Sequence, residues 1–513
     1  MSTANICIVI TIAVYLVMMV AIGAFFSRKN RKTDDFYLGG RHLGPLVTAM
    51  SAEASDMSSY LLLGIPGLAL ATGVAEAGWT IIGLSVGTYL NWLFVAKRLR
   101  VYTQHIDAIT IPDYFARRFG DKKHLITLVA ALIIIVFFVP YTASGFSACG
   151  KLFSTLFGTE YKTAMLISAA VIVIYCTLGG FLAASTTDFI QSIIMTLALL
   201  IVLGFAEGVV GGFDKVFENV KNLNGYMDLN KGYNIGTGET GSYGFLPVVS
   251  TLAWGLGYFG MPHILLRFMA IEDKNKLKLS RRVAEIWVII SMAVAGLIGI
   301  CGYSLMKSGF IPEYKDNSQA ETAIIDVAKH LSHFGYIPAV VAGLILAGIL
   351  ASTMSTADSQ LLASASAFSQ NMLQEVFKLK ISEKKSLIIA RLSVVAVSVV
   401  AVFLAMDPDS SVFRIVSFAW AGFGAAFGPI MLFSLFWKRT NKWGAISGML
   451  SGGIMVFVWK FIIREEFAGS ALDIYELLPA FIISCIFIVA VSLLTKAPDE
   501  EIVKTFEEVK AEL

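Results

Sequence analysis

VTAMSAEASDMSSYLLLGIPG, residues 47–67, is the stretch that decides the fold. It lies between long apolar runs, yet it carries the carboxyl groups of Glu53 and Asp56 and ends in the helix-loosening run GIPG. A carboxylate near the middle of a bilayer costs a few kcal/mol, so it normally faces a cavity or a partner. Loosened backbone is tolerated there only when protein or a cavity receives it. The stretch therefore predicts an interrupted membrane helix whose freed oxygens hold a cation; the alternative is a kinked helix whose serines bond to their own turn.

The composition around this stretch is that of an integral membrane protein. The chain has 513 residues, 56% of them hydrophobic and 15% charged, and its mean hydropathy is +0.73. Apolar runs near the ~20 residues that cross a bilayer recur along it. The net charge of +3 is too small to indicate nucleic acid as a partner. We therefore predict an all-α polytopic membrane protein whose surroundings are the lipid bilayer.

The apolar runs predict thirteen transmembrane helices. Lys and Arg are concentrated in the segments that follow the odd-numbered spans. The positive-inside rule assigns those segments to the cytoplasm. We therefore expect a plasma-membrane protein with its N-terminus outside and its C-terminus inside. The predicted spans are residues 5–26, 45–71, 77–96, 124–149, 162–183, 188–211, 244–266, 283–306, 337–366, 386–407, 411–436, 443–463 and 475–495.

A second interruption, five spans after the first, predicts the organisation of the chain. The run WGLGYFGMPH in the seventh span places three glycines and Pro262 in one short segment. A unit of five helices crosses the bilayer an odd number of times, so a second copy runs in the opposite sense. Matching interruptions in two inverted halves point to a transporter site at the bilayer midplane. The predicted units are a first span with a basic cytoplasmic loop (1–44), inverted repeat one (45–211), an external loop (212–243), inverted repeat two (244–436), and two last spans with a tail (437–513). The end of this tail, 496–513, is expected to be a solvated helix.

The ninth span carries a polar stripe. Ser352, Ser355, Thr356 and Ser359 have the spacing of one helical face. Such hydroxyls either pack helices together or present an oxygen-rich surface to a hard cation such as Na⁺. Asp358 adds an ionisable group inside a span and favours the functional interpretation.

A few other residues within spans are candidates for a site. Asp188 opens the sixth span and is either an N-terminal helix cap or part of an ion path. Tyr141 follows a proline inside the fourth span, and Trp254 and Tyr258 share a helical face beside the second interruption. Aromatic walls with a few polar groups suit a small organic ligand. The sequence shows no nucleophile–base pair, metal-ligand spacing or nucleotide-binding loop, so an enzyme is not expected.

Five motifs together resemble a known family. They are SAEASDMSSYLLLGIPG, LRVYTQHIDAITIPDYFARRF, TLGGFLAASTTDFIQ, WGLGYFGMPHILLRFMA and STMSTADSQLL. They are similar to the sodium/solute symporter family, most closely to its sodium/proline symporter branch, over about residues 33–290 and again through the ninth span. The resemblance implies a LeuT-type core of two inverted five-helix repeats. It also implies alternating access driven by inward flow of Na⁺, with no other cofactor.

The resemblance implies site residues position by position. The expected Na⁺ ligands are three backbone carbonyls and two hydroxyls, those of Ala54, Met57, Ser352, Ser355 and Thr356. Asp56 is expected to be the carboxylate that supports Na⁺ binding. A second cation site of some relatives matches the positions of Asp188, Ser355, Asp358 and Ser359. The expected lining of a proline pocket is Ser58, Tyr141, Trp254, Tyr258 and Pro262.

The sequence departs from the proline branch near the expected pocket. Glu53 stands where glycine is usual, Tyr60 follows Ser59 where Gly-Trp is common, Met261 replaces a glutamine, and Asp358 stands where a small or hydroxyl residue is common. Glu53, Tyr60 and Met261 are therefore expected to tune the substrate or the ion. We hypothesise either two bound cations or a proton carried by Glu53 or Asp358.

The leading hypothesis is Na⁺-coupled uptake of L-proline by alternating access. One alternative is Na⁺- or H⁺-coupled uptake of another small organic solute, namely another amino acid, a carboxylate or a sugar. A second alternative, from a different class, is a solute sensor without net flux.

Overall fold

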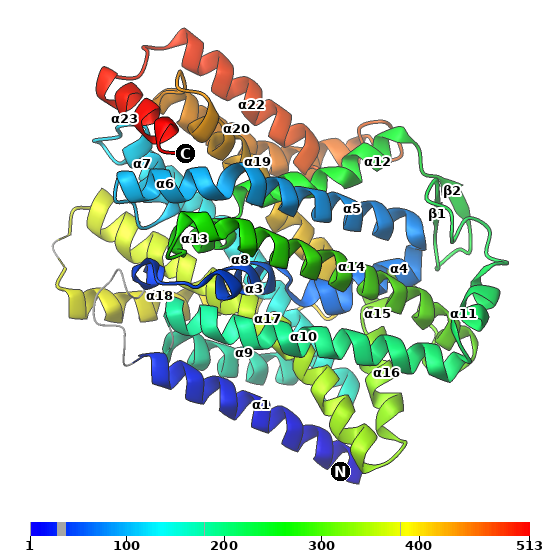
Figure 1. Cartoon of the computed structure of the whole chain (residues 1–513). Coiled ribbons are helices and arrows are strands. Elements are labelled where there is room, and N and C mark those ends of the chain that lie inside the picture. Colours follow the sequence, from blue (N-terminus) through cyan, green and yellow to red (C-terminus); the bar gives the residue numbers. More distant parts are fainter. Residues whose placement is uncertain (1, 28–36, 179, 380) are drawn as a thin grey trace.

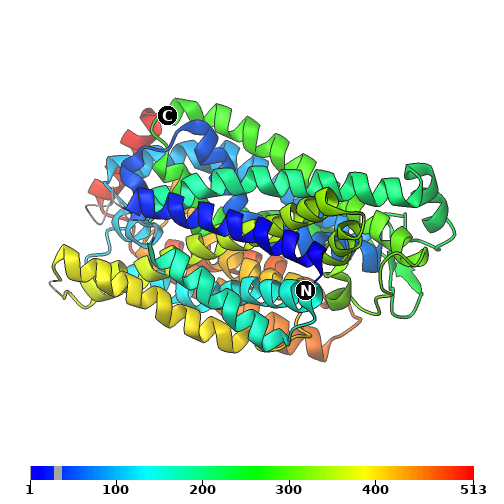
Figure 2. The same cartoon turned by 90° about the horizontal axis from the view of Figure 1, so that it is seen from below.

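The apolar sequence dictates helices, because a backbone exposed to lipid has to satisfy its polar groups within its own segment. A computed structural model describes residues 2–27, 37–178, 180–379 and 381–513. Residues 28–36, in the basic loop expected after the first span, lie outside the described residues. The long helices lie side by side in one bundle, with the first helix along its lower edge (Figure 1); seen from below, this helix lies across the near face of the bundle (Figure 2).

The helices and strands are labelled as in Figure 1. They are α1 (Thr3–Ser27), α3 (Pro45–Asp56), α4 (Ile65–Thr72), α5 (Val74–Leu90), α6 (Lys97–His105), α7 (Ile111–Arg118), α8 (Leu125–Phe157), α9 (Tyr161–Leu178), α10 (Phe181–Val210), α11 (Phe213–Val220), β1 (Lys231–Tyr233), β2 (Thr240–Ser242), α12 (Phe245–Leu252), α13 (Pro262–Ala270), α14 (Leu277–Lys307), α15 (Asn317–Ala320), α16 (Ala323–Ser332), α17 (Tyr336–Ser366), α18 (Glu383–Leu404), α19 (Val412–Phe436), α20 (Lys442–Val458), α21 (Arg464–Glu466), α22 (Leu477–Leu494) and α23 (Glu500–Ala511). The two strands form an antiparallel hairpin in which Gly232 pairs with Gly241.

In the part of the chain that the structure describes, nine helices are long and apolar enough to cross a membrane. They are Thr3–Phe25, Val74–His105, Leu125–Phe157, Phe181–Val210, Lys274–Lys307, Tyr336–Val376, Val412–Phe436, Lys442–Glu466 and Leu477–Leu494. Four further apolar helices are shorter, namely Tyr60–Thr72, Tyr161–Ile174, Phe245–Gly260 and Ile388–Leu404. Each expected span overlaps one of these helices, and the number that crosses the bilayer stays a prediction.

The first expected interruption is present. Helix α3 ends at Asp56, and Met57 leaves the helical conformation with φ −70° and ψ 69°. A π-helical turn over Tyr60–Gly64 then leads into α4. Gly64 and Ile65 keep helical dihedrals, so Pro66 lies inside one continuous helical run, Tyr60–Thr72. A proline in a helix interior removes one N–H donor and crowds the preceding turn, and the π-helical turn lies directly before it. The sequence GIPG thus belongs to the helix after the break, and the break itself falls on Met57 and the two serines after it.

The second expected interruption is also present, between a 3-10 helix and α13. A 3-10 helix over Ala253–Gly260 ends at Met261, which is extended with φ −78° and ψ 108°, and Pro262 begins α13. A Cβ on Gly255 would overlap the backbone of Gly83 in α5. Small residues of this kind allow two helix backbones to touch, and here they seat the interrupted helix directly on α5.

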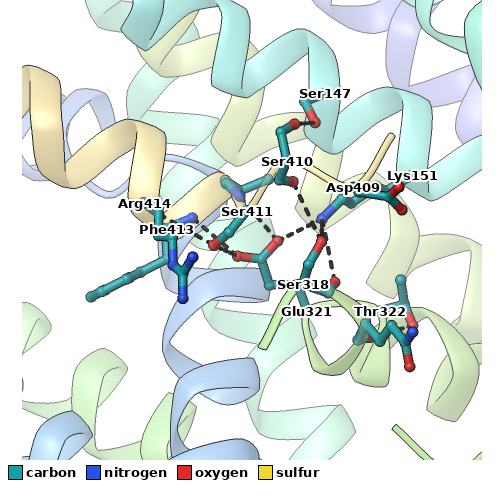
Figure 3. Close-up of polar contacts among 12 residues, drawn as sticks. Ser147, Lys151, Ser318, Glu321, Thr322, Asp409, Ser410, Ser411, Phe413 and Arg414 are labelled. Atoms are coloured by element: carbon teal, nitrogen blue, oxygen red, sulfur yellow. Dashed lines mark hydrogen bonds and ion pairs between the residues drawn. The ribbon is translucent and has the colours of Figure 1, made fainter. Parts of the chain in front are cut away.

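A buried ion pair fixes the segment between α14 and α17 against two other helices (Figure 3). Lys151 Nζ of α8 lies 2.8 Å from Oε2 of Glu321, and the two side chains are 6% and 0% exposed. Glu321 also accepts hydrogen bonds from Ser411 Oγ at 2.7 Å and from the N–H groups of Val412 and Phe413 at 3.0 Å. A carboxylate at a helix start satisfies N–H groups that lack partners within the helix. One carboxylate thus ties the α15–α16 segment to α8 and α19.

The C-terminal helix differs from the solvated helix expected over 496–513. Phe506 and Val509 of α23 are buried, and the guanidinium carbon of Arg118 lies 4.9 Å from the ring centroid of Phe506. Glu507 pairs with Lys438 at 2.9 Å. The expected helix is present and most of it is exposed or half-buried. Its buried face was not expected, because the alternating charges mask two apolar residues three positions apart, which share one helical face.

Glu321→Gln is expected to destabilise the protein by about 3–5 kcal/mol, because it leaves the Lys151 charge buried without a carboxylate. Unfolding of the purified protein in detergent, followed by tryptophan fluorescence, measures the loss. Glu313→Gln is the matched control, since Glu313 is exposed on the same segment. Equal effects of the two substitutions would contradict the structural role of the ion pair.

Candidate cation and solute site

The end of α3 lies against the hydroxyl stripe of α17. Ser355 Oγ donates a hydrogen bond to the carbonyl oxygen of Ala54 over 2.8 Å. The hydroxyls of Ser355 and Thr356 also lie 3.2 and 3.1 Å from the carbonyl oxygen of Ser352. The structure thus brings four of the five expected Na⁺ ligands together, and we call these four residues the oxygen cluster. Met57, the fifth, is buried where α3 ends.

Asp56 is held in place by two tyrosines. The Tyr258 hydroxyl donates to Asp56 Oδ2 over 2.6 Å, and the Tyr141 hydroxyl donates to the Asp56 backbone carbonyl over 3.3 Å. Asp56 is fully buried, and its Oδ1 accepts no hydrogen bond from the described residues. A buried charged oxygen without a donor is costly. This atom is therefore suited to receive a cation or the ammonium group of a ligand.

The expected solute-lining residues fall in two places. Ser58 and Tyr141 line a small enclosed cavity of about 10 Å³ that also touches Thr356 of the oxygen cluster. Trp254 instead lies in the wall of a cavity of about 950 Å³, which we call the large cavity. The ring centroid of Trp254 lies 5.1 Å from that of Tyr475, and the two rings are stacked. The large cavity is lined by polar, charged and apolar residues, some of them from the segment 212–243.

The residues expected to tune the substrate lie at the two helix interruptions. Tyr60 is fully buried after the first break, and its hydroxyl contacts the sulfur of Met57 at 3.4 Å. Met261 and Pro262 are buried at the second break. The Tyr258 ring meets the edge of Trp420 with centroids 5.0 Å apart. Of these side chains, Tyr258 contacts the carboxylate of Asp56 directly.

Glu53 is bonded to the following membrane helix rather than to α17. Its Oε1 accepts hydrogen bonds from Trp92 Nε1 at 2.7 Å and from Thr88 Oγ1 at 3.2 Å. Trp92 packs in turn on Phe268 of α13, with ring centroids 4.4 Å apart. Sequence reasoning missed both partners, because neither a tryptophan nor a threonine inside an apolar run signals a buried acceptor.

Asp188 and Ser359 meet at a guanidinium group. Arg267 Nη2 lies 3.1 Å from Asp188 Oδ2 and donates to Ser359 Oγ over 2.6 Å. Arg267 Nε donates to Ser51 Oγ at 3.1 Å, and Ser51 donates to the same carboxylate oxygen of Asp188 at 2.7 Å. The remaining terminal nitrogen donates to the carbonyl of His263 at 2.9 Å. We call Arg267 and these partners the arginine cluster; it joins α3, α10, α13 and α17.

Two expectations about these residues were wrong. Arg267 was expected in a connecting loop that follows a span ending at residue 266, but it lies within α13 and is 1% exposed. Asp188 lies inside α10, seven residues after its start at Phe181, so the alternative that it caps a helix does not hold. Pro262 was the signal for Arg267, because a helix that begins at Pro262 includes the arginine.

Asp358 lies beside the arginine cluster. The hydroxyl of Ser359 contacts Asp358 Oδ1 at 3.1 Å while it accepts from Arg267. Asp188 and Asp358 therefore lie at opposite ends of one polar chain. Asp56 does not belong to this chain, because its carboxylate is bonded to Tyr258.

Two interrupted helices, an oxygen cluster at one of them and buried charges between four helices define a cation-coupled secondary transporter. Residues 36–452 match the model of the sodium:solute symporter family. The chain is 42% identical over 493 residues to the osmoregulated proline transporter OpuE of Bacillus subtilis, covering 96% of this chain and 95% of that protein. It is 40% identical over 504 residues to the sodium/proline symporter of Escherichia coli, covering 98% and 96%. The chain belongs to the sodium:solute symporter family, whose members are transporters and use Na⁺ as the coupling ion.

Solved structures show the same fold. A Na⁺-coupled sialic acid symporter in a substrate-bound outward-open state superposes with a TM-score of 0.77 at 17% identity, over 96% of this chain and 99% of that one. Mhp1, a transporter of the nucleobase-cation-symport-1 family, superposes with a TM-score of 0.54 at 13% identity, over 94% and 99%. The protein is a multi-pass membrane protein with the LeuT-type fold.

Tyr258→Phe is expected to lower the free energy of unfolding in Na⁺-free buffer by about 1–3 kcal/mol, because it leaves the buried carboxylate of Asp56 without its hydroxyl donor. Unfolding of the purified protein in detergent measures this. The control is Tyr243→Phe, which removes a similar hydrogen bond, to Thr251, from a half-buried position that water reaches. A loss no larger at Tyr258 than at Tyr243 would show that the Asp56 contact is not a stabilising one.

Proposed function

We propose that this protein imports L-proline together with Na⁺ by alternating access. The observation that carries the proposal is the contact of Ser355 Oγ with the carbonyl of Ala54, which joins the interrupted helix to α17. Relatives that are about 40% identical over nearly the whole chain are named proline transporters and sodium/proline symporters. Burial of the aromatic and polar residues around Asp56 supports a small zwitterion as the solute.

The proposed Na⁺ site is the oxygen cluster completed by the carbonyl of Met57. Hard cations are bound by oxygen atoms, and the cluster supplies the carbonyls of Ala54 and Ser352 with the hydroxyls of Ser355 and Thr356. Asp56, the last residue of α3, balances the charge. Na⁺ between α3 and α17 stabilises the conformation in which the two helices touch. A solute that binds this same conformation better is then coupled to Na⁺, and each ligand raises the affinity for the other by the same factor.

The proposed proline site lies between the two interruptions. Tyr141 and Tyr258 contact Asp56, Ser58 lines a small cavity with Tyr141, Pro262 begins the helix after the second interruption, and Trp254 lines the large cavity. The amine of proline is placed toward Asp56, and its carboxylate toward N–H groups at the starts of the helical run Tyr60–Thr72 and of α13, where helix dipoles favour an anion. The enclosed cavity of about 10 Å³ is too small for a solute. Helices therefore have to separate for the solute to enter, as alternating access requires.

We further propose thirteen spans in the plasma membrane, with inverted repeats at 45–211 and 244–436. The excess of Lys and Arg after the odd-numbered spans supports an outer N-terminus and a cytoplasmic C-terminus. In this orientation the segment 212–243 and the large cavity face the outside.

Cysteine labelling tests the orientation. In a variant without native cysteines, a membrane-impermeant maleimide should label Thr237→Cys in intact cells and Lys504→Cys only after the membrane is opened. Both positions are exposed. The reverse pattern would overturn the orientation without affecting the transport function.

Uptake of labelled proline into proteoliposomes tests the function. Accumulation is expected under an inward Na⁺ gradient and not under a pH gradient alone. Ser355→Ala is expected to raise the Na⁺ concentration for half-maximal activation about ten- to a hundredfold. The reason is that a polar contact with a charged group contributes ~1.5–3 kcal/mol of binding free energy. Ser398→Ala is the control, since the Ser398 hydroxyl bonds to Val394 of its own helix.

The other outcomes of the uptake experiment are informative too. Accumulation driven by a pH gradient would favour H⁺ coupling, with Glu53 as the first residue to replace. Na⁺-driven uptake of another amino acid, a carboxylate or a sugar in preference to proline would keep the symporter and change its substrate. Solute binding without flux would indicate a sensor.

A further inference from the structure

A groove between α1 and α9 has no part in the proposed transport mechanism. Its volume is about 360 Å³, and the two helices that flank it lie side by side in Figure 1. The walls include Ile12 of α1 and Ile172 of α9, and the floor includes Leu350 and Met354 of α17. We call this feature the α1–α9 groove. Its chemistry and its place in the fold indicate a ligand of its own.

The lining of the groove selects a hydrocarbon. The three hydroxyl groups in it, those of Thr159, Thr163 and Ser168, already donate hydrogen bonds within their own segments over 2.8 to 3.3 Å. Water finds few partners in such a place, and cavities with apolar walls exclude it. An apolar cavity of about 150 Å³ takes up a molecule as large as benzene. The α1–α9 groove is more than twice that size, so it can hold several methylene groups of a chain.

The groove opens on the surface that faces lipid. Ile167 in its α9 wall is 63% exposed, and Val9 and Val171 in its lining are exposed as well. They belong to apolar helices of a multi-pass membrane protein, so the hydrocarbon of the bilayer surrounds them. A lipid tail therefore reaches the groove without crossing a polar surface.

The groove has the depth of one leaflet. One end lies at Phe157 and Thr159, in the connection between α8 and α9, and the other at Met354, near the middle of α17. Along α9 the groove extends from Thr163 to Ile172, which is about 13 Å of helix. One leaflet contributes about 15 Å of hydrocarbon. A chain that enters beside the α8–α9 connection can follow the groove to mid-membrane while its headgroup stays at the surface.

The floor of the groove is the back of the helix that carries the oxygen cluster. Leu350 and Met354 lie one helical turn apart, and they are 4% and 1% exposed. Each precedes a member of the oxygen cluster, Ser352 or Thr356, by two residues, and two residues turn a helix by about 200°. The groove and the oxygen cluster therefore lie on opposite faces of α17. The sulfur of Met354 also contacts the hydroxyl of Tyr15 in α1 at 3.8 Å.

We propose that the α1–α9 groove binds one acyl chain of a membrane phospholipid, and that the bound chain supports α17 behind the oxygen cluster. In the proposed orientation this lipid belongs to the outer leaflet. The binding site depends on the membrane location and on the apolar lining, so it is independent of the identity of the solute and the ion. The support of α17 rests on the proposed Na⁺ site and gives that site a lipid dependence.

Photocross-linking in bilayer nanodiscs tests the binding site. The probe is a phosphatidylethanolamine with a diazirine near the end of one acyl chain, and mass spectrometry locates the label. Label on Leu350 or Met354 is expected, and it requires a chain inside the groove because both side chains are buried. Label confined to exposed residues of the flanking helices, such as Val14 and Ile174, overturns the inference.

Variants that fill the groove give the matched comparison. Ala13 lines the groove from α1 and is exposed, so Ala13→Phe places a ring in the groove. This variant should lower the label on Leu350 and Met354 at least fivefold. Ala21→Phe is the control, because Ala21 is exposed on the same helix outside the groove, and it should leave the label unchanged.

A second filling variant keeps the comparison decisive if Ala13→Phe does not fold. Ala164→Leu adds volume from the α9 wall and should lower the same label. If label on Met354 in a folded filling variant equals that in the wild type, the labelled chain does not lie in the groove, and the inference is overturned.

The support of α17 has a separate readout in proteoliposomes. Phospholipids with methyl-branched chains are too wide to follow the groove, so the wild type should need at least twice the Na⁺ concentration for half-maximal uptake in them as in straight-chain lipids. Ala13→Phe should show a smaller difference, because its own ring fills the groove. Equal values for the wild type in both lipids overturn the support of α17. If no Na⁺-driven uptake is found in either lipid, the proposed function fails, while the cross-linking result stands by itself.

Discussion

The structure depends on one constraint: a helix that breaks inside a membrane has to have its loose backbone groups received by other parts of the protein. At the first break, α17 meets this demand with the Ser355 hydroxyl on the Ala54 carbonyl. Tyr141 contributes a second donor to the carbonyl of Asp56. The hydroxyl groups and carbonyls that meet at the break are oxygen donors to a cation. The contacts that stabilise the interrupted helix thus also form the proposed Na⁺ site.

Much of the fold could be predicted from the sequence, because the strongest signals are local and periodic. Apolar runs give the helices, and the glycines with Pro262 mark the second break. The hydroxyl stripe of α17 follows from helical spacing, and the structure places Ser352, Ser355 and Thr356 beside α3. The family resemblance supplied Ala54 and Met57, whose main-chain oxygens carry no side-chain signal.

The remaining features depend on contacts between distant segments. Glu53 was singled out, but its partners on the next helix could not be named, because Trp92 and Thr88 look like ordinary membrane residues. Arg267 was missed because a basic residue near the end of a span is normally counted as loop charge. The docking of α23 was missed because Phe506 and Val509 form too small an apolar face to stand out among charges. In each case the deciding partner is far away in the sequence.

The close approach of α5 to the second interrupted helix limits how the molecule can rearrange. A Cβ on Gly83 would overlap the backbone of Leu252, and one on Gly87 would overlap that of Gly255, so the two helices meet main chain to main chain. Surfaces fitted so closely have no room to slide over each other. The two helices are therefore expected to move together in any rearrangement. Met261, the extended residue between the 3-10 helix and α13, is then the joint about which the rest of the interrupted helix can turn.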